Sequence, residues 1–486
     1  MNQESGIDRG VKISLGLTFI VCLVATYWFR NYTQDDALIY YRYIRNALEG
    51  EGLVYNPGER FNGLTSPLYS YLSLLVSWAT NDITQSQIWL GGVGLFLTCL
   101  VMAGLFRPLP LVAATLPLML ATSRYFYSYF GLETSWFLFL AALAILLYQK
   151  NKYGLLGVAC ACLLLVRGES LFLVLILAGR HFLEHRPFPR PRLFIIPAVI
   201  LAGHYTFTYW YYGKFLPSTL AAKIYQGKSG LWGAWPCFLQ IADPVKKLFD
   251  GSPVLIVGIV VTGLVGTAGF ISGIKNRNFL TLLAFTVACT LFYVFLNIPN
   301  YPWYFSVHCL LFYTGAAFGL DFLYKLVTPI SARFRFPIHR LGYGLLVVVL
   351  TGMQLYLIYG YVGRHGGGWR HYVVIGQWLE QHTPPDAQVA CSEIGHIGWY
   401  SKRKIIDIVG LVNHHNARLI GERKLGHWLK YYQPDYILIH NPPWLYEQWT
   451  PQLVAAGLYA PDARFDFPGF SLFARRTAKV LGRTGP

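Results

Sequence analysis

The sequence predicts an α-helical protein that crosses a membrane many times and carries a small α/β domain towards its C-terminal end. Of its 486 residues, 54% are hydrophobic and only 13% are charged, whereas soluble globular proteins have about 25% charged residues. Long apolar runs alternate with short basic loops, as in polytopic membrane proteins. The composition becomes ordinary again from about residue 364. These observations exclude a cytosolic enzyme, a disordered chain and a small disulfide-rich secreted domain.

About eleven segments are predicted to cross the membrane. The first, Ile13 to Phe29, lacks a small-residue cleavage site and is expected to remain as an uncleaved helix. The other candidates are 88–106, 109–123, 132–148, 153–166, 170–179, 193–212, 253–274, 279–298, 303–324 and 341–363. Three of them, 109–123, 153–166 and 170–179, are shorter than the ~20 residues of a straight span, so tilted or broken helices are expected. The apolar run 67–80 would break the alternation of sides, and we expect it not to span.

The charge of the loops predicts how the helices run. The chain has 40 basic and 23 acidic residues, a net charge of +17, and its basic residues gather in alternate loops. Those loops hold Arg107, Lys150 with Lys152, the stretch 180–192, Lys275 with Arg277, and the stretch 325–340. Because positive charge marks cytoplasmic loops, the N-terminus is expected in the cytoplasm and the C-terminal domain outside. The basic residues form no stripe of the kind that nucleic-acid binders use, so no nucleic-acid partner is expected.

Two outer loops and the C-terminal segment make up the predicted extracytoplasmic parts. The loops cover 30–66 and 213–252 and belong to a transmembrane domain, 1–363. The segment 364–486 is expected to form the α/β domain. Its strands are predicted at Gln388–Cys391, Lys404–Val409, Tyr436–His440 and Phe470–Ala474, and its helices at Tyr372–His382 and Gly426–Tyr432.

The first outer loop carries the clearest chemical signal. Asp35 and Asp36 follow the outer end of the first helix, and Arg42 lies two turns beyond Asp35 on one face of a short amphipathic helix. A carboxylate can act as a general base and an arginine can bind phosphate in a fork, which suits a lipid-phosphate substrate. Two adjacent carboxylates also suit a divalent cation, Mg²⁺ or Mn²⁺. The alternative, given equal weight, is that both aspartates only cap the helix and favour its dipole.

Further ionisable residues are predicted near the same membrane face. Glu133 stands at the outer mouth of one helix, and Arg167 and Glu169 interrupt an apolar run. Ionisable groups at membrane depth are costly and tend to be functional or paired. Arg167 is therefore expected either to bind a phosphate or to pair with Glu169 or Glu133. Lys214 and Lys223 are the corresponding cations of the second outer loop.

Aromatic and turn residues at this face also have structural alternatives. Tyr304 and His308 lie on one side of a helix at its outer end. They would form either part of the aromatic belt, which is usual at a membrane interface, or a platform for a sugar. Glu59, Thr65 and Ser66 belong to a turn-rich stretch of the first loop, where a purely structural turn is favoured.

Several segments, in order along the chain, resemble one group of membrane enzymes. They are Asp35-Asp36-Ala37, Glu49–Arg60, Gly63–Pro67, Gly131–Thr134, Leu165–Arg167, Tyr212–Thr219, Glu393–Tyr400 and Ile406–Leu411. Together they resemble the GT-C-fold glycosyltransferases, in particular the terminal β-(1→2)-arabinofuranosyltransferases of mycobacterial cell-wall arabinan and related Gram-negative enzymes that arabinosylate type IV pilins. The chain departs from that pattern at Gly168, where proline is common, and at Ser218, where asparagine is common.

The resemblance implies a GT-C fold in the bacterial inner membrane and transfer of a sugar, most simply arabinofuranose, from polyprenyl phosphate. The acceptor would be a cell-wall or lipid-linked glycan, or a pilin. Asp35 and Asp36 would lie at the centre of the site, as the catalytic base and its partner or as cation ligands. The chemistry of the residues themselves makes Arg42, Arg167 and Lys223 candidates for binding the donor phosphate. The candidates for other substrate contacts are Glu133, Glu59, Thr65, Ser66, Lys214, Tyr304, His308, Glu393 and His396.

Two other classes of function are compatible with a polytopic chain. A transporter or lipid flippase is expected to hold its ionisable residues near the middle of the membrane, often in repeated halves. In this sequence the acidic residues collect at one face and no repeat is visible, which favours the enzyme. A non-catalytic assembly scaffold would tolerate the loss of both Asp35 and Asp36, which the enzyme would not.

Overall fold

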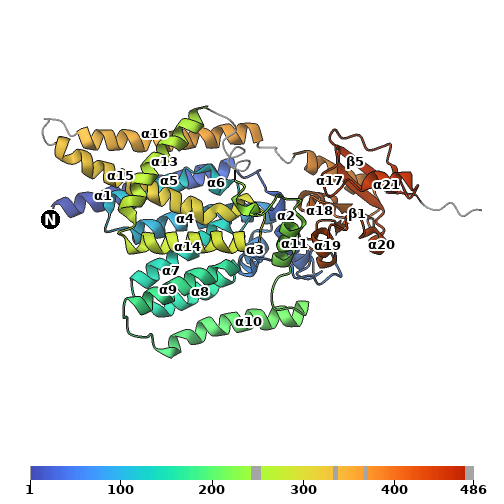
Figure 1. Ribbon diagram of the computed structural model, residues 1–486, viewed down its shortest axis with the longest axis horizontal. Helices are drawn as coiled ribbons and strands as arrows, with labels where there is room; N and C mark the ends of the chain where they lie inside the picture. The colour runs from blue at the N-terminus through green and yellow to red at the C-terminus, as the bar shows by residue number, and fades with distance from the viewer. Residues whose placement is uncertain (1, 242–252, 332–337, 366–369, 477–486) are drawn as a thin grey trace, which may run out of the picture.

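The computed structural model describes residues 2–241, 253–331, 338–365 and 370–476. A long bundle of helices occupies one end of the molecule, and a sheet flanked by helices occupies the other (Figure 1). The N-terminus lies at the end of the bundle that is remote from the sheet. The division follows the composition of the chain, because the apolar segments form the bundle and the segment of ordinary composition forms the sheet.

Each predicted span coincides with a helix. The helices are α1 (Asn2–Trp28), α4 (Ile83–Leu105), α5 (Pro110–Ala121), α7 (Thr134–Gln149), α8 (Tyr153–Leu164), α9 (Leu171–Leu183), α10 (Ile195–Tyr212), α13 (Pro253–Gly273), α14 (Arg277–Phe295), α15 (Ser306–Ser331) and α16 (Ile338–His365). Among the described residues, six segments are long and apolar enough to cross a membrane, namely Arg9–Trp28, Ile83–Leu105, Pro191–Tyr212, Arg277–Phe295, Pro302–Ser331 and His339–Val362. The chain is therefore a multi-pass membrane protein, as its hydropathy predicts.

Small residues let two of these helices touch through their backbones. A Cβ on Gly269 of α13 would lie 1.7 Å from the carbonyl oxygen of Gly315 in α15, and one on Gly319 would lie 1.9 Å from the carbonyl oxygen of Val265. Lipid offers no hydrophobic driving force between helices, so close backbone packing through glycine is a common way to join them in a membrane. The α13–α15 pair is joined in this way.

Two short helices lie at the sheet end of the bundle. They are α2 (Asp35–Leu48) and α3 (Pro67–Thr80) (Figure 1). Ser73 and Ser77 of α3 both bond to one residue in the first turns of α4, since Ser73 Oγ donates to Gln87 Oε1 at 2.6 Å and Gln87 Nε2 donates to Ser77 Oγ at 3.1 Å. Helix α3 therefore stays at the end of the bundle where α2 lies, which agrees with the expectation that 67–80 does not span.

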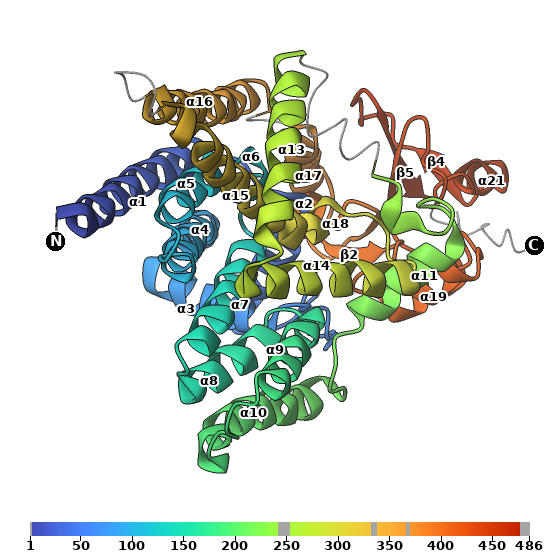
Figure 2. The same ribbon diagram turned by 60° about the vertical axis from the view of Figure 1, so that its left-hand side comes forward.

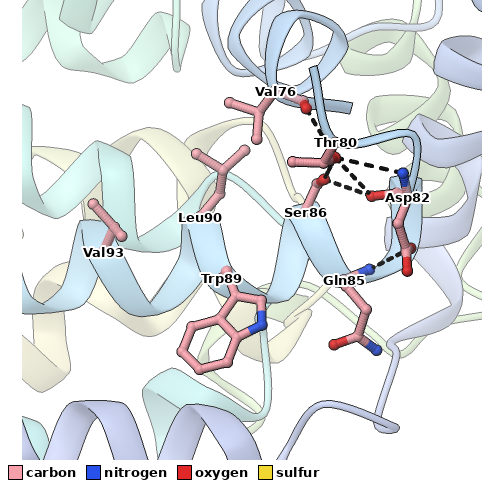
Figure 3. A pocket seen from close by; sticks show the side chains of 8 residues that line it. All are labelled: Val76, Thr80, Asp82, Gln85, Ser86, Trp89, Leu90 and Val93. Atoms are coloured by element: carbon pink, nitrogen blue, oxygen red, sulfur yellow. Dashed lines mark hydrogen bonds between the residues drawn. The ribbon is translucent and has the colours of Figure 1, made fainter. Parts of the chain in front are cut away.

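The turn between α3 and α4 encloses a small, mainly apolar pocket (Figure 3). Asp82 caps α4 by accepting a hydrogen bond from the backbone N–H of Gln85 at 2.9 Å, and the hydroxyl oxygens of Thr80 and Ser86 lie 2.5 Å apart. These polar groups hold the turn itself. The pocket belongs to a helical hairpin and is separate from the predicted site residues.

The α/β domain is a five-stranded mixed sheet covered by short helices. Its strands are β1 (Gln388–Cys391), β2 (Lys404–Asp407), β3 (Tyr436–His440), β4 (Tyr459–Pro461) and β5 (Phe470–Arg475), in the order β2-β1-β3-β5-β4. β1 is parallel to β2 and β3, whereas β5 is antiparallel to β3 and β4. The helices are α17 (Arg370–His382), α18 (Ile394–Ser401), α19 (His414–Gly421), α20 (Leu429–Tyr432) and α21 (Thr450–Ala455).

Two predicted bounds in this domain are corrected. The helix expected over 426–432 begins only at Leu429, because Gly426 has a left-handed φ of +80° that ends any regular helix. The strand expected over 404–409 ends at Asp407, whose carboxylate turns the following backbone. In the second outer loop, the helices α11 (Thr219–Ser229) and η3 (Cys237–Leu239) are seen, and 242–252 lies outside the described residues.

Helix α18 of the α/β domain packs against α2. One hydrophobic core joins them, with Ala37 and Tyr41 from α2 and Ile394 and Ile397 from α18 among its members. On the other side, α11 of the second outer loop packs beside α19 (Figure 2). The domain is therefore held by both outer loops.

Two glycines allow the close approach of α18 to the first outer loop. A Cβ on Gly395 would lie 1.9 Å from the carbonyl oxygen of Asp35, and one on Gly398 would lie 2.2 Å from the hydroxyl oxygen of Tyr55. Both distances are far shorter than van der Waals contact. A larger residue at either position would push α18 away from α2.

We expect Gly395→Ala to destabilise the protein by about 1–3 kcal/mol through overpacking, although alanine is the better helix former. Thermal unfolding of the purified protein in detergent would show this as a lower midpoint. Gly179→Ala in α9 is the matched control, because nothing lies within 4 Å of the added Cβ. Equal midpoints for the two variants would contradict the proposed close docking.

Candidate functional site

Asp35 lies at the junction between the bundle and the α/β domain. Its Oδ2 accepts a hydrogen bond from Gly395 N at 3.0 Å, and its Oδ1 accepts one from His396 N at 2.7 Å and lies 2.8 Å from His396 Nδ1. The side chain of Glu393, the N-cap residue of α18, makes no capping hydrogen bond. Asp35 therefore caps α18 from another part of the chain, and both of its oxygens are engaged by protein donors.

Asp36, the next residue in α2, has a different environment. Its carboxylate is half-buried and makes no hydrogen bond within the described part of the chain. Burial raises the pKa of Asp36 to about 6, with Asp35, Glu133 and Asp407 adding to the rise and Lys223 opposing it. Asp36 is thus ionised at neutral pH, is more basic than an ordinary aspartate, and is not committed to a structural bond.

Lys223 of α11 is the cation that acts most strongly on Asp36. Its side chain is 7% exposed, and its Nζ lies 3.7 Å from the centre of the Tyr301 ring. Nζ has no hydrogen-bond partner among the described residues, and burial lowers the pKa of this ammonium group. A buried ammonium without an acceptor is costly, so this position fits an anionic ligand.

Three more buried polar atoms lack hydrogen-bond partners in the described structure. One lies in the same helix as Lys223, and two lie in the first outer loop, which contacts the second. They are Thr219 Oγ1, one turn earlier in α11, and Asn62 Nδ2 and Ser66 Oγ in the first outer loop. The two segments are joined by a hydrogen bond from Ser218 N to the carbonyl oxygen of Asn62 at 2.9 Å. Since buried polar groups are nearly always satisfied in folded proteins, this wall has the donors that a polar ligand would use.

Arg167 lies in an ion-pair network. Its Nε is 2.9 Å from Glu169 Oε1 and 3.4 Å from Glu133 Oε1, and its guanidinium carbon lies 4.9 Å from the centre of the Tyr304 ring. The hydroxyl of Tyr293 donates to Glu169. Of the two alternatives that the sequence left open, the structure shows pairing with both glutamates. Helices α8 and α9 are short and are joined by a turn, η1 (Gly168–Ser170), and Arg167 lies where they meet. This agrees with the broken helices expected for 153–166 and 170–179.

The predicted phosphate role of Arg42 is corrected. Nε donates to the carbonyl oxygen of Tyr55 at 2.7 Å, and Nη1 donates to that of Gly398 at 2.6 Å. Nη2 donates to Asn56 Oδ1 at 3.0 Å and to the carbonyl oxygen of Arg403 at 2.7 Å. With a side chain only 2% exposed, Arg42 joins the first outer loop to the α/β domain and does not face a ligand.

Three other candidates are engaged in local structure. Glu59 Oε1 forms an exposed ion pair with Lys404 Nζ at 2.6 Å. Thr65 shares a hydrogen bond with the hydroxyl of Tyr40. Lys214 is exposed, and its Nζ lies 3.4 Å from Ser218 Oγ. These contacts place Glu59 on the outside of the domain junction and Lys214 on the rim of the second outer loop.

His308 and His396 are also bound to protein groups. His308 Nε2 lies 2.7 Å from Thr290 Oγ1, a contact between α15 and α14. His396 contacts Asp35 and is 2% exposed. Its contact thus contributes to the docking of α18.

Asp407 belongs to the segment Ile406–Leu411 and was not predicted as a site residue. Its carboxylate nevertheless fixes the backbone beside the site. Its Oδ1 accepts hydrogen bonds from the N–H groups of Val409 and Gly410 at 2.9 and 2.8 Å, and its Oδ2 accepts one from Val412 at 2.7 Å. This buried carboxylate contributes to the electrostatic environment of both Asp36 and Lys223. The available signal was an aspartate inside the predicted strand 404–409, three residues before a glycine.

A divalent cation bridging Asp35 and Asp36 does not fit this bonding. The oxygens of Asp35 already accept backbone and imidazole hydrogen bonds. Within the ranges that the structure describes, no three His, Cys, Asp or Glu side chains form a group that could hold a metal ion. No chemical step is therefore derived through a metal at this pair.

Comparison of sequences gives two named relatives and one family model. The model, described as a domain of unknown function (DUF8728), matches residues 364–479. A Corynebacterium glutamicum protein named terminal β-(1→2)-arabinofuranosyltransferase is 36% identical over 90 residues, 17% of this chain and 13% of that protein. A Mycobacterium tuberculosis protein of the same name is 27% identical over 244 residues, 44% of this chain and 39% of that protein. The chain therefore matches well under half the length of either relative.

Comparison of structures identifies the fold. The oligosaccharyltransferase of Archaeoglobus fulgidus, solved with a tethered acceptor peptide, aligns with a TM-score of 0.58 at 13% identity, over 95% of this chain and 74% of that chain. ArnT from Cupriavidus metallidurans, solved with undecaprenyl phosphate, aligns with a TM-score of 0.58 at 12% identity, over 96% and 98% of the two chains. The predicted fold class, a helical GT-C membrane fold with a small C-terminal sheet domain, is confirmed.

We expect Arg42→Lys to lower the midpoint of thermal unfolding. A lysine has one ammonium group and cannot bond to four acceptors on separate segments, so buried carbonyl oxygens would lose their donors at a cost of about 1–3 kcal/mol each. Arg418→Lys is the matched control, since Arg418 is 56% exposed and forms an ion pair with Glu422, four residues further along the chain. Unchanged unfolding of Arg42→Lys would overturn the docking role.

Proposed function

We propose that this protein is a membrane glycosyltransferase that moves a sugar, most simply arabinofuranose, from a polyprenyl phosphate to a hydroxyl group outside the cytoplasm. The observation that carries this proposal is that Asp36 and the ammonium group of Lys223, neither of which has a hydrogen-bond partner among the described residues, act on each other electrostatically at the sheet end of the bundle. The names of the sequence relatives support the sugar. The undecaprenyl phosphate in the ArnT structure supports the class of donor.

The chemistry needs one base and one cation. The acceptor hydroxyl attacks the anomeric carbon of the donor, and Asp36 takes the proton of that hydroxyl. The bond between the anomeric carbon and the phosphate oxygen breaks, and its electron pair leaves with the phosphate. Phosphate is a stable anion, so no general acid is required. Lys223 would stabilise the charge that develops on the leaving phosphate.

The other charged groups would keep this pair in place. Asp35 holds α18 against α2 and so places the α/β domain beside Asp36. Glu133 lies close enough to raise the pKa of Asp36 and is itself held by Arg167. In this proposal Asp36 is the catalytic base, Asp35 is a positioning residue, and the Glu133–Arg167–Glu169 network supports the wall of the site.

The proposed acceptor is a cell-wall glycan, a lipid-linked glycan or a pilin on the outer side of the inner membrane. The positions of the basic loops support the outer side, because positive charge is typical of cytoplasmic loops and these loops lie at the opposite end of the bundle. A transporter or flippase is less well supported, because Asp36, Lys223 and Glu133 lie in or beside the outer loops and not within the long spans.

We expect Asp36→Asn to lower the rate of transfer by about 10²–10⁴-fold, as the loss of a general base does, with unchanged thermal unfolding. Wild-type kcat should fall as the pH drops below about 6, because protonation removes the base. Transfer of radiolabelled sugar from polyprenyl-phosphoryl-arabinofuranose by purified enzyme measures both effects. Asp35→Asn is the comparison, and it should lower the unfolding midpoint as well as the rate. Full activity in Asp36→Asn would refute the proposed base.

We expect Lys223→Met to raise the KM for the donor by about 10- to 100-fold, since a hydrogen bond to a charged group contributes about 1.5–3 kcal/mol. The KM for the acceptor should change little. Lys214→Met is the matched control, because Lys214 lies in the same outer loop but is exposed. Steady-state kinetics with varied donor concentration would reveal the difference, and equal effects of the two variants would argue against a phosphate site at Lys223.

A further inference from the structure

Glu393 occupies an unusual place at the start of α18. It is the N-cap residue of this helix, but its side chain makes no capping hydrogen bond, because the Asp35 carboxylate accepts from Gly395 N and His396 N. The Glu393 carboxyl group therefore does not cap the helix, although Glu393 is the N-cap residue. It is half-buried, and within the described ranges it forms no ion pair or hydrogen bond.

The surroundings of Glu393 are acidic and aromatic. Asp35 and Asp36 act on it from α2, and Glu447 acts on it from the segment before α21. The electrostatic partners of Glu393 also include the hydroxyl groups of three tyrosines, Tyr301, Tyr372 and Tyr446. Burial, reinforced by the three carboxylates, raises the pKa of Glu393 well above its ordinary value. Burial and the neighbouring carboxylates thus both favour the protonated form of the Glu393 carboxyl group.

The backbone that carries Glu393 is held on both sides. On one side Ser392 Oγ donates to Glu447 Oε1 at 3.0 Å, and Glu447 is fully buried and also accepts from His440 N at 3.1 Å and Trp444 N at 3.0 Å. On the other side the first turn of α18 is held by Asp35. A side chain supported in this way is suited to binding a ligand with defined geometry.

The aromatic residues Tyr301 and Trp303, with Lys223, also indicate a ligand. Tyr301 interacts electrostatically with both Asp36 and Glu393, and the buried, unpartnered Nζ of Lys223 lies over its ring. The Tyr301 ring stacks on Trp303 with ring centres 4.8 Å apart and an interplanar angle of 16°. Asp36, Lys223 and Glu393 are thus all within interaction range of Tyr301.

We propose that Glu393 is an acceptor-binding residue, whose carboxyl group forms a hydrogen bond with a hydroxyl beside the attacking one, on an uncharged, polyhydroxylated acceptor. The inference rests on the proposed glycosyltransferase function. A neutral carboxyl group can donate and accept hydrogen bonds, as a sugar hydroxyl requires. A phosphorylated or uronic-acid acceptor would be repelled by Asp35, Asp36 and Glu447. The α/β domain therefore holds the acceptor, while α2 supplies the base.

Kinetics of two substitutions test this assignment. With octyl α-D-arabinofuranoside as the acceptor probe, Glu393→Ala should raise the acceptor KM about tenfold, the effect of losing one hydrogen bond. Glu393→Gln should stay within about twofold of wild type, because an amide also donates. The donor KM should be unchanged in both. The wild-type acceptor KM should rise at alkaline pH as Glu393 ionises, and that rise should be absent in Glu393→Gln.

Three outcomes would overturn the inference. The first is a Glu393→Gln variant as impaired as Glu393→Ala, which would mean that the negative charge is needed. The second is that both variants match wild type. The third is an alkaline rise in KM that persists in Glu393→Gln. Glu59→Gln is the control, since Glu59 is a half-exposed glutamate in a surface ion pair. Complete absence of transfer by wild type would count against the proposed function, whereas normal transfer with unaffected Glu393 variants would count only against this inference.

Infrared spectroscopy gives a readout that does not depend on turnover. The carboxyl stretching band of a protonated acid should be present in wild type at neutral pH, should persist in Glu59→Gln and should weaken in Glu393→Gln. An identical band in wild type and Glu393→Gln would show that Glu393 is ionised, and the inference would then fail whatever the activity.

Discussion

The capping of α18 by Asp35 is the interaction on which the site depends. A carboxylate from α2 fills the N-terminus of a helix whose residues follow it in the chain by about 360 positions. Helix N-termini attract negative charge because their N–H groups are unpaired and their dipoles align. This bond joins the apolar bundle to the α/β domain at the point where the proposed base lies, so the docking of the domain and the assembly of the site are one event.

Arg42 reinforces the same junction with hydrogen bonds of its own. Its guanidinium joins Tyr55 and Asn56 of the first outer loop to Gly398 and Arg403 of the domain. A buried cation is tolerated only when its donors are satisfied, and here protein oxygens provide that. Asp35 and Arg42 therefore act as a pair of opposite charges that hold one interface, and neither remains available for substrate.

The division of labour among the charged groups follows from this. Asp35, Arg42 and Arg167 are each bound to partners inside the protein. Asp36, Lys223 and Glu393 are groups near the junction that can carry charge and whose side chains lack such hydrogen bonds within the described residues. A site built in this way has rigid walls and uncommitted reactive groups, which is the arrangement expected of a preorganised catalytic centre.

The sequence by itself determined the membrane-spanning helices, the strands Gln388–Cys391 and Tyr436–His440, and the concentration of acidic residues at one end of the bundle, because hydropathy and residue type are local properties. It also identified Asp35 and Asp36 as a pair. Only the tertiary structure decided that Asp35 takes part in docking the domain and Asp36 does not. It also showed that Arg42 bonds to protein groups at the junction, and that Asp407 lies near the site. These roles depend on partners hundreds of residues away, as with Asp35 and His396, 361 residues apart. Packing decides which distant donors reach a carboxylate, and no local pattern records that.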